Sequence, residues 1–457
     1  MDSTAIATSL PAIATDLGVA PVALQLALTT YLLALATFIP LSGWLADRFG
    51  ARPVFQMAIA TFLLGSLGCA AADSLGMLVA ARFVQGMGGA MMTPVGRLVL
   101  LRSVPKDRLV HALSWLTLPA LLGPMLGPPL GGLITTVSSW RYIFLINLPI
   151  GVLGIWLAWK HVPLLRSPVQ KLDWRGFAWL APGLALAMFG FSTLGRHLVR
   201  TPLAVTCLVV GLAGLALYRE HWRRHEHALL DLALLRLPTF RIAVLGGSLF
   251  RIGAGAMPFL LPLMLQLGFG MTPLQSGLLT FTGAIGAMAM KPMAGPILKR
   301  HGFRRVLLAN GLAASGALCG YGLFQADTPA ALIVTVLLAS GLLRSLQFTS
   351  LNALVYAEVG EDRLAQASSV ATMTQQLSTA VGVTVGSYTL GAAAVLTGKP
   401  TMAPLNFGLA FLAMGLVSAA ASLVFAKLAP AAGAEMAGHA QAGREVREPM
   451  PTQRPQA

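Results

Sequence analysis

Few charged side chains interrupt the apolar segments of this sequence, and those few are its chemically active candidates. Asp2 is the only acid that falls inside such a segment, whereas Arg82 is a cation well inside its own. At membrane depth, burial favours the neutral carboxyl group, while a neighbouring guanidinium favours the carboxylate. A group under these two opposing influences can bind and release a proton. We therefore predict that Asp2 carries a proton, with Arg82 as its partner.

Further residues are candidates for the wall of a substrate cavity. Gln85 lies three residues after Arg82, on roughly the same helical face. Arg251 lies about ten residues into its apolar segment, too deep for the helix end. Met257 and Phe259 follow it, and such side chains suit varied apolar guests. Ordinary packing in a core or against lipid explains Met257 and Phe259 equally well.

Two glycine-containing segments could control how helices turn and pack. In "GWLADRFGAR" (43–52), glycines allow tight turns, and Asp47 can accept hydrogen bonds from a facing helix as a charge latch. In "GPMLGPPLGG" (123–132), glycines four residues apart let helices approach closely, and Pro128 bends the helix. A solvated turn and a plain packing helix are the alternatives. The latch candidates are Gly43, Asp47, Arg48, Gly50 and Arg52, and the packing candidates are Gly123, Gly127, Pro128, Gly131 and Gly132.

The composition is that of a membrane protein. Of the 457 residues, 56% are hydrophobic and only 11% are charged, against about 25% charged in soluble domains. The formal net charge of +16 would suggest nucleic acid for a soluble chain, but here the cations lie between apolar runs, a pattern that indicates orientation in a membrane. We expect no nucleic-acid partner. The three cysteines lie singly in apolar segments, and no signal-peptide pattern opens the chain.

The apolar runs predict an all-helical membrane protein with about fourteen spans. The cations concentrate in one set of alternate loops, which places both termini in the cytoplasm. Residues 43–52 recur as 295–304, which indicates two parallel halves, as in many transporters. The predicted domains are 1–160, 161–234 with two extra helices, 235–429, and a disordered tail over 430–457. The predicted spans are 2–15, 23–44, 53–72, 75–98, 109–134, 141–159, 176–195, 202–218, 240–266, 273–298, 304–324, 329–357, 364–392 and 403–427.

Other charged groups have two open interpretations. Lys291 and Arg344 either face a cavity or extend their charges to the membrane surface. "HWRRHEH" (221–227) could hold a metal ion, but a basic segment facing anionic lipid is the favoured interpretation. No phosphate-binding, hydrolase or redox motif is present, so the sequence predicts no enzyme, no bound cofactor and no resident metal.

These segments resemble motifs of a known transporter superfamily over nearly the whole chain. The 43–52 segment looks like the loop between helices two and three of the major facilitator superfamily, and 123–132 resembles its fifth-helix antiporter motif. "RFVQGMGGA" (82–90) resembles its fourth-helix motif. "DSTAIATSLP" (2–11) and "WRYIFLINLPIG" (140–151) are similar to segments of the fourteen-helix drug:proton antiporters, and other stretches look most like MdtD-type multidrug exporters.

The resemblance implies two pseudo-symmetric six-helix bundles plus two extra central helices. It implies proton-coupled efflux of small, drug-like molecules across the cell (inner) membrane by alternating access, powered by the proton gradient and carried out by a monomer. An exporter of one specific metabolite and a non-transporting membrane sensor are the alternatives. In relatives a longer stretch of helix precedes the acid equivalent to Asp2, so we expect a late start codon or a truncated chain here; the alternative is a genuinely short first helix with impaired coupling.

Overall fold

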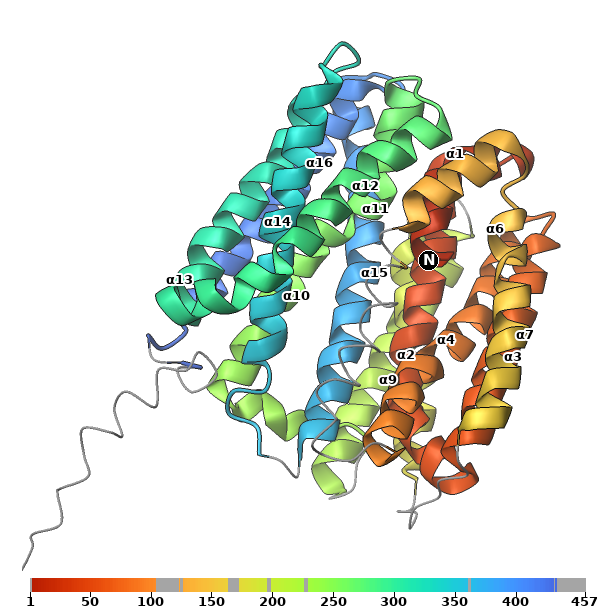
Figure 1. Ribbon diagram of the computed structural model, residues 1–457, viewed down its shortest axis with the longest axis vertical. Helices are drawn as coiled ribbons and strands as arrows, with labels where there is room; N and C mark the ends of the chain where they lie inside the picture. The colour runs from red at the N-terminus through yellow and green to blue at the C-terminus, as the bar shows by residue number, and fades with distance from the viewer. Residues whose placement is uncertain are drawn as a thin grey trace, which may run out of the picture.

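The computed structural model is a bundle of long helices (Figure 1). It describes residues 2–103, 123, 126–162, 172–194, 199–225, 229–360, 363–430 and 432–433. Within these residues there is no strand, and 11 helical segments are long and apolar enough to cross a membrane. The predicted class, an all-helical membrane protein, is confirmed.

The helices follow the predicted order. Three predicted spans are not among the 11 because α1 (Asp2–Asp16), α12 (Pro273–Ala289) and the helical residues 126–137 are each too short as described. The helices are α1 (Asp2–Asp16), α2 (Gln25–Phe49), α3 (Ala51–Ala70), α4 (Leu75–Ser103), α6 (Tyr142–Leu145), α7 (Asn147–His161), α8 (Trp174–Thr193), α9 (Thr201–Arg224), α10 (Pro238–Gly255), α11 (Met257–Leu263), α12 (Pro273–Ala289), α13 (Lys291–Gly320), α14 (Ala330–Leu354), α15 (Leu364–Thr397) and α16 (Pro404–Phe425).

Two spans that the sequence predicted as continuous helices are broken. The 240–266 span divides into α10, α11 and a π-helical turn, with Pro258 at the start of α11. The 273–298 span stops at the end of α12, and α13 begins with Pro292 in its first turn. Proline lacks the N–H that would continue the preceding helix, so it favours a new start. The continuous helix predicted over 273–298 was therefore wrong.

Two glycines related by the internal repeat have the same unusual backbone. Gly50, between α2 and α3, has a φ of 96°, and Gly302, inside α13, has a φ of 73°. Glycine adopts positive φ at little cost, whereas other residues are strained there. Gly302 interrupts α13 at the predicted boundary between two spans. We name this end of the bundle the Gly50 end and the opposite one the Asp16 end.

The arginine two residues after each glycine performs the same task in each half. The Nη1 of Arg52 donates to the carbonyl oxygen of Trp159 near the end of α7, at 3.4 Å. The Nη2 of Arg304 donates to the carbonyl oxygen of Ala426 at the end of α16, at 3.1 Å. Helix C-termini expose unpaired carbonyls and attract cations. In both halves, the arginine therefore joins the turn at the positive-φ glycine to the last helix of that half.

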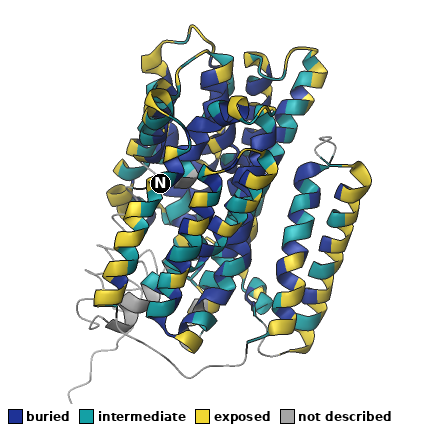
Figure 2. Cartoon of the chain, turned by 90° about the vertical axis from the view of Figure 1, so that its right-hand side faces the viewer, coloured by how far each residue is buried: buried dark blue, intermediate teal, exposed yellow. Residues whose placement is uncertain are grey.

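Helices α8 and α9 form a hairpin beside the main bundle (Figure 2). Ser192, near the end of α8, contacts both halves. Its carbonyl accepts from Gln25 of α2 at 3.1 Å, and its hydroxyl bonds to Thr384 of α15 at 3.1 Å. Tyr388 of α15 donates to the carbonyl of Phe191. The end of the hairpin thus rests on the line where α2 packs along α15. The domain boundaries at 160, 234 and 429 stay a prediction.

The histidine run at the end of α9 belongs to the contact between the hairpin and its connecting segments. The Nε2 of His221 lies 2.7 Å from Asp173 Oδ1, and its ring stacks on His225 at 3.9 Å. Asp173 also accepts from the N–H groups of Gly176 and Leu229. His227 lies outside the described residues. Among the residues that the structure describes, no cluster of three potential metal ligands occurs.

Candidate functional site

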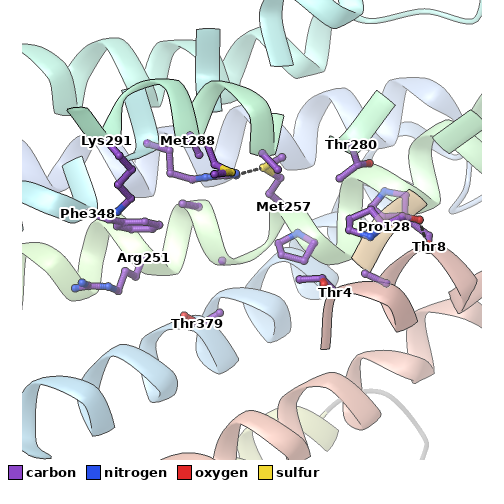
Figure 3. A pocket seen from close by; sticks show the side chains of 18 residues that line it. Thr4, Thr8, Pro128, Arg251, Met257, Thr280, Met288, Lys291, Phe348 and Thr379 are labelled. Carbon is purple, nitrogen blue, oxygen red and sulfur yellow. Dashed lines mark hydrogen bonds between the residues drawn. The ribbon is translucent and has the colours of Figure 1, made fainter. Parts of the chain in front are cut away.

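A cavity of about 330 Å³ lies between the two halves (Figure 3). Its first-half wall comes from α1 and the helix at 126–137, and its second-half wall from α10 to α15. Thr8 and Pro128 lie toward one end, while Arg251, Lys291 and Phe348 lie toward the other. Methionines Met257 and Met288 are also part of the wall. The cavity therefore has two cations at one end, while its middle combines methionine side chains with the guanidinium of Arg344, which donates to the sulfur of Met257.

Direct hydrogen bonds close the contact between the halves at the Asp16 end. The Nε2 of Gln266 donates to the carbonyl of Thr8 at 2.7 Å, and the N–H of Leu274 donates to Thr136 Oγ1 at 3.2 Å. These are the side-chain hydrogen bonds that join the two halves directly within the described ranges. The α12 residues that line the cavity begin at Thr280 and continue toward the end of the helix, away from this contact near its start. The cavity therefore lies on the Gly50 side of the closed contact.

The same contact contains a reciprocal pair of Pro-x-x-x-Gly segments. A Cβ at Gly132 would stand 2.4 Å from the carbonyl oxygen of Pro273, and one at Gly277 would stand 2.3 Å from the carbonyl oxygen of Pro128. Each glycine follows its own proline by four residues and meets the proline of the other segment. Glycine at both positions lets the backbones approach this closely. The glycine-rich segment 123–132 thus reaches across to the second half.

Gly127 and Gly131 belong to the helix at 126–137, and the backbone of Gly123 is also helical. Gly131 faces α1, where a Cβ would stand 2.4 Å from the carbonyl oxygen of Ala5. Gly127 is buried, and Gly123 is half-buried. Sequence reasoning missed Gly277 and Gln266. The repeated Pro-x-x-x-Gly spacing and a lone glutamine in an apolar run were the signals that could have found them.

Arg82 lies fully buried inside the first half. Its Nη1 donates to Gln85 Oε1 at 2.6 Å, its Nε donates to the carbonyl of Ala27 at 3.3 Å, and its guanidinium lies over the Tyr31 ring at 4.2 Å. Gln85 in turn donates to Ser66 Oγ at 2.8 Å. A charged group in apolar surroundings is stable only with such partners. This network joins α2, α3 and α4.

The two predicted acids lie at described backbone positions, but their side chains lie outside the description. Asp2 is the first residue of α1, two residues before Thr4 of the cavity wall. Asp47 and Gly43 belong to α2, close to its end. Arg48, in the last turn of α2, is exposed. The proton pair Asp2 and Arg82 and the Asp47 latch therefore stay predictions.

Arg251 is the most buried cation of the cavity wall. Its side chain is 8% exposed, its Nη2 donates to Asn352 Oδ1 at 3.1 Å, and its guanidinium lies 5.3 Å from the Phe348 ring centre. Its Nε has no hydrogen-bond partner. The neighbouring Gly247 leaves space for it, since a Cβ there would stand 2.8 Å from Nη1 of Arg251. The packing thus holds the guanidinium in place without a counterion among the described residues.

Two more cations complete the charged part of the wall. Arg344 donates to the sulfur of Met257, and Lys291 Nζ donates to Thr349 Oγ1 at 3.3 Å. Both residues line the cavity, as do Arg251 and Met257. Of the other candidates, Gln85 belongs to the Arg82 network, and Phe259 is fully buried. Phe259 and Gln85 are not among the lining residues because their sides of the helices face other helices.

An exposed ion pair lies at the Asp16 end. The side chain of Arg141 donates to Asp16, and Trp140 Nε1 donates to the same carboxylate at 3.2 Å. The hydrogen bond from Arg141 is the main cause that lowers the pKa of the Asp16 carboxyl from its ordinary value, and the bond from Trp140 acts in the same direction. Arg141 also donates to the carbonyl of Ala72. This pair therefore ties α1 to the segments before α4 and α6.

Comparison with known proteins identifies the family. The family model described as Major Facilitator Superfamily matches residues 1–383 and 243–451. The chain belongs to this superfamily. It is therefore a multi-span membrane transporter, and transport of small molecules, rather than enzyme catalysis, is the activity of the fold.

Similar curated proteins match most of the length of the chain. A protein of Pectobacterium carotovorum named "Putative multidrug resistance protein MdtD" is 38% identical over 435 residues, covering 93% of this chain and 92% of that protein. The protein of the same name from Klebsiella pneumoniae is 39% identical, covering 86% and 83%. The resemblance to MdtD-type proteins is thus confirmed.

Solved transporter structures share the fold at low sequence identity. The chain is similar to a D-xylose–proton symporter with a TM-score of 0.69 at 14% identity, covering 94% of this chain and 95% of that one. It is also similar to an auto-inhibited POT family peptide transporter with a TM-score of 0.64 at 16% identity, covering 100% and 96%.

Proposed function

We propose that this protein exports small amphipathic or drug-like molecules in exchange for protons by alternating access. The observation that carries the proposal is the cavity between the halves, which hydrogen bonds and glycine packing seal at the Asp16 end. A rocking motion that opens this contact and closes the other side would move a bound molecule across the membrane. The name of the MdtD relatives supports drugs as the substrates.

Asp2 is the proposed proton carrier and Arg82 its partner. Arg82 is held by the network with Gln85, Ala27 and Tyr31, so its charge has a fixed place inside the first half. A proton that neutralises Asp2 would weaken its attraction to that charge, and the release of the proton would restore it. The attraction between Asp2 and Arg82 thus couples the protonation of Asp2 to the position of α1. The proton gradient supplies the energy, with no bound cofactor.

The proposed setting is the cell (inner) membrane, with both termini in the cytoplasm and the monomer as the working unit. The cation-rich loops support this orientation because cytoplasmic loops carry most lysines and arginines. In this orientation the Gly50 end faces the cytoplasm. The cavity would then receive substrate from the cytoplasm while the Asp16 end is closed.

Purified protein in liposomes tests the proposal. Vesicles would be loaded with a panel of amphipathic fluorescent compounds that differ in charge, and their transport would be followed with and without an imposed pH gradient. The expected result is gradient-driven transport with counterflow of protons, seen with a pH-sensitive dye. Transport that is unchanged after an ionophore collapses the gradient would rule out proton antiport, and a single transported compound would favour a specific exporter.

Two matched variants on α1 test the proton carrier. Asp2→Asn is expected to abolish gradient-driven transport while the protein stays folded. Asp16→Asn, at the other end of the same helix, removes an exposed acid and is expected to leave gradient-driven transport in place. Undiminished proton-driven transport by Asp2→Asn would refute the role of Asp2.

A further inference from the structure

The cavity wall has an uneven charge. Three cations line it, namely Arg251, Lys291 and Arg344, and no carboxylate is among the lining residues that the structure describes. Within the described part of the chain, none of the three forms an ion pair. A buried cation without a counterion, such as Arg251, attracts an anion strongly because water screens it little, whereas Lys291 is exposed and Arg344 is partly buried. All three come from the second half.

Arg251 is the cation that packing holds most firmly. It is nine-tenths buried, it has an unpartnered Nε, and the partners that the structure describes for its guanidinium, Asn352 and Phe348, are both neutral. A buried guanidinium without a carboxylate partner is costly, and a bound anion would lower that cost. The side-chain carbonyl of Asn352 fixes its direction but brings no formal charge. The guanidinium of Arg251 is therefore able to form an ion pair with an anionic ligand.

The rest of the wall selects for an apolar body attached to the charge. Figure 3 shows Arg251 and Lys291 at the end where Phe348 lies, with Met257 and Pro128 farther along the cavity. The volume of about 330 Å³ suits a molecule of one or two rings. Met and aromatic side chains adapt to varied apolar shapes.

We infer that this cavity binds organic anions, with an acidic group near Arg251 and Lys291 and an apolar body along Met257 and Met288. The inference rests on the proposed function and specifies its substrate class. A cationic amphiphile of the same shape would be repelled by the three cations, and a neutral one would bind through the apolar wall alone. Charge selection therefore resides in the second half, apart from the predicted proton pair in the first half.

Three probes with the same ring system separate charge from shape. They are 1-naphthylacetate, the neutral 1-naphthylacetamide and the cationic 1-naphthylmethylamine. Equilibrium binding of each radiolabelled probe to the purified full chain in a nonionic detergent needs no proton gradient, so it is independent of antiport. The anion is expected to bind about tenfold or more tightly than the neutral amide, the effect of one charge-assisted hydrogen bond. The cation is expected to bind least.

Variants of the wall identify the cause of the preference. Arg251→Gln is expected to weaken binding of the anion about tenfold and to leave binding of the amide unchanged, whereas Arg251→Lys should retain part of the preference. Lys291→Gln should act in the same direction. The matched controls Arg200→Gln and Lys399→Gln remove exposed cations outside the cavity. They should change neither the binding of the anion nor the binding of the amide.

Equal affinity of the wild type for the three probes would overturn the inference even if proton-driven export is found. So would an anion preference that survives Arg251→Gln and Lys291→Gln together. Displacement of naphthylacetate by phosphatidylglycerol at similar concentrations would assign the cations to a lipid headgroup instead. Loss of export with the anion preference intact would refute the proposed antiport but leave the inferred binding specificity standing.

Discussion

The reciprocal glycine contact between the halves makes a quantitative prediction. In Gly132→Ala, the new methyl group would stand 2.4 Å from the Pro273 carbonyl oxygen, 2.9 Å from its carbon and 3.0 Å from the Leu274 Cα. These are backbone atoms, so no flexible side chain can yield. Ordinary contact begins at 3.4 Å, so the halves must separate here by about 1 Å. Overpacking of this kind costs about 1–3 kcal/mol, which shifts an equilibrium about 5- to 150-fold.

Cross-linking measures that shift. In a variant without Cys69, Cys207 and Cys319, the substitutions Thr136→Cys and Leu274→Cys place thiols on two residues that a hydrogen bond of 3.2 Å, from the backbone N–H of Leu274 to Thr136 Oγ1, now joins across the halves. Oxidation should yield a disulfide readily, and adding Gly132→Ala should lower its rate of formation at least several-fold. Substrate transport should fall in parallel, because the state closed at the Asp16 end becomes less populated.

A second glycine supplies the control. Gly316 lies in α13 with an exposed surface, and a Cβ there would meet nothing within 4 Å. Gly316→Ala should therefore leave both cross-linking and transport unchanged, while Gly277→Ala should act like Gly132→Ala. If Gly132→Ala folds, forms the disulfide at the rate of its parent and transports normally, the close contact does not control the equilibrium and the reasoning is refuted.

Three further substitutions have expected outcomes. Arg82→Lys should abolish transport and destabilise the protein by about 2 kcal/mol, because one ammonium group cannot bind both Ala27 and Gln85 as the guanidinium does; thermal unfolding and efflux check this, and normal efflux would contradict it. Asp16→Asn should cost less than about 1 kcal/mol at neutral pH, since the pair is exposed. The lowered pKa of Asp16 stabilises the wild type fully above the ordinary value of 3.8, and this contribution is lost as the pH falls through the lowered pKa, so the two unfolding curves should begin to converge as the pH falls below about 3.8. Tyr388→Phe should lose about 1 kcal/mol and speed hydrogen exchange at the end of α8, whereas unchanged exchange there would show that the hydroxyl does not hold the hairpin.

The sequence predicts well the features that depend on local composition. Apolar length places the helices, and the glycines at 50 and 302 mark the repeated turns. The break before α13 was missed because the apolar run continues through residue 290 while Pro292 removes a backbone donor. A local pattern contains this information, but hydropathy alone ignores it.

Contacts between distant segments could not be predicted in the same way. In a membrane, core-facing and lipid-facing side chains are equally apolar, so the pattern does not say which face of a helix is buried. Phe259 and Met257 therefore looked alike, although Met257 lines the cavity and Phe259 is buried between helices. The bond from Gln266 to Thr8 joins residues 258 positions apart. Only the folded arrangement brings such partners together.

The arginines after the repeated turns have a consequence for motion. Arg52 and Arg304 each bind the last helix of their own half, so the third span of each half is tied to its last helix. This bond resists sliding of the helices within a half, since displacing one of the two joined helices strains the other. Movement is then easier at the surface between the two halves, where glycine backbones touch and few hydrogen bonds must break. Each half would accordingly rotate as a rigid body about the contact between the Pro-x-x-x-Gly segments.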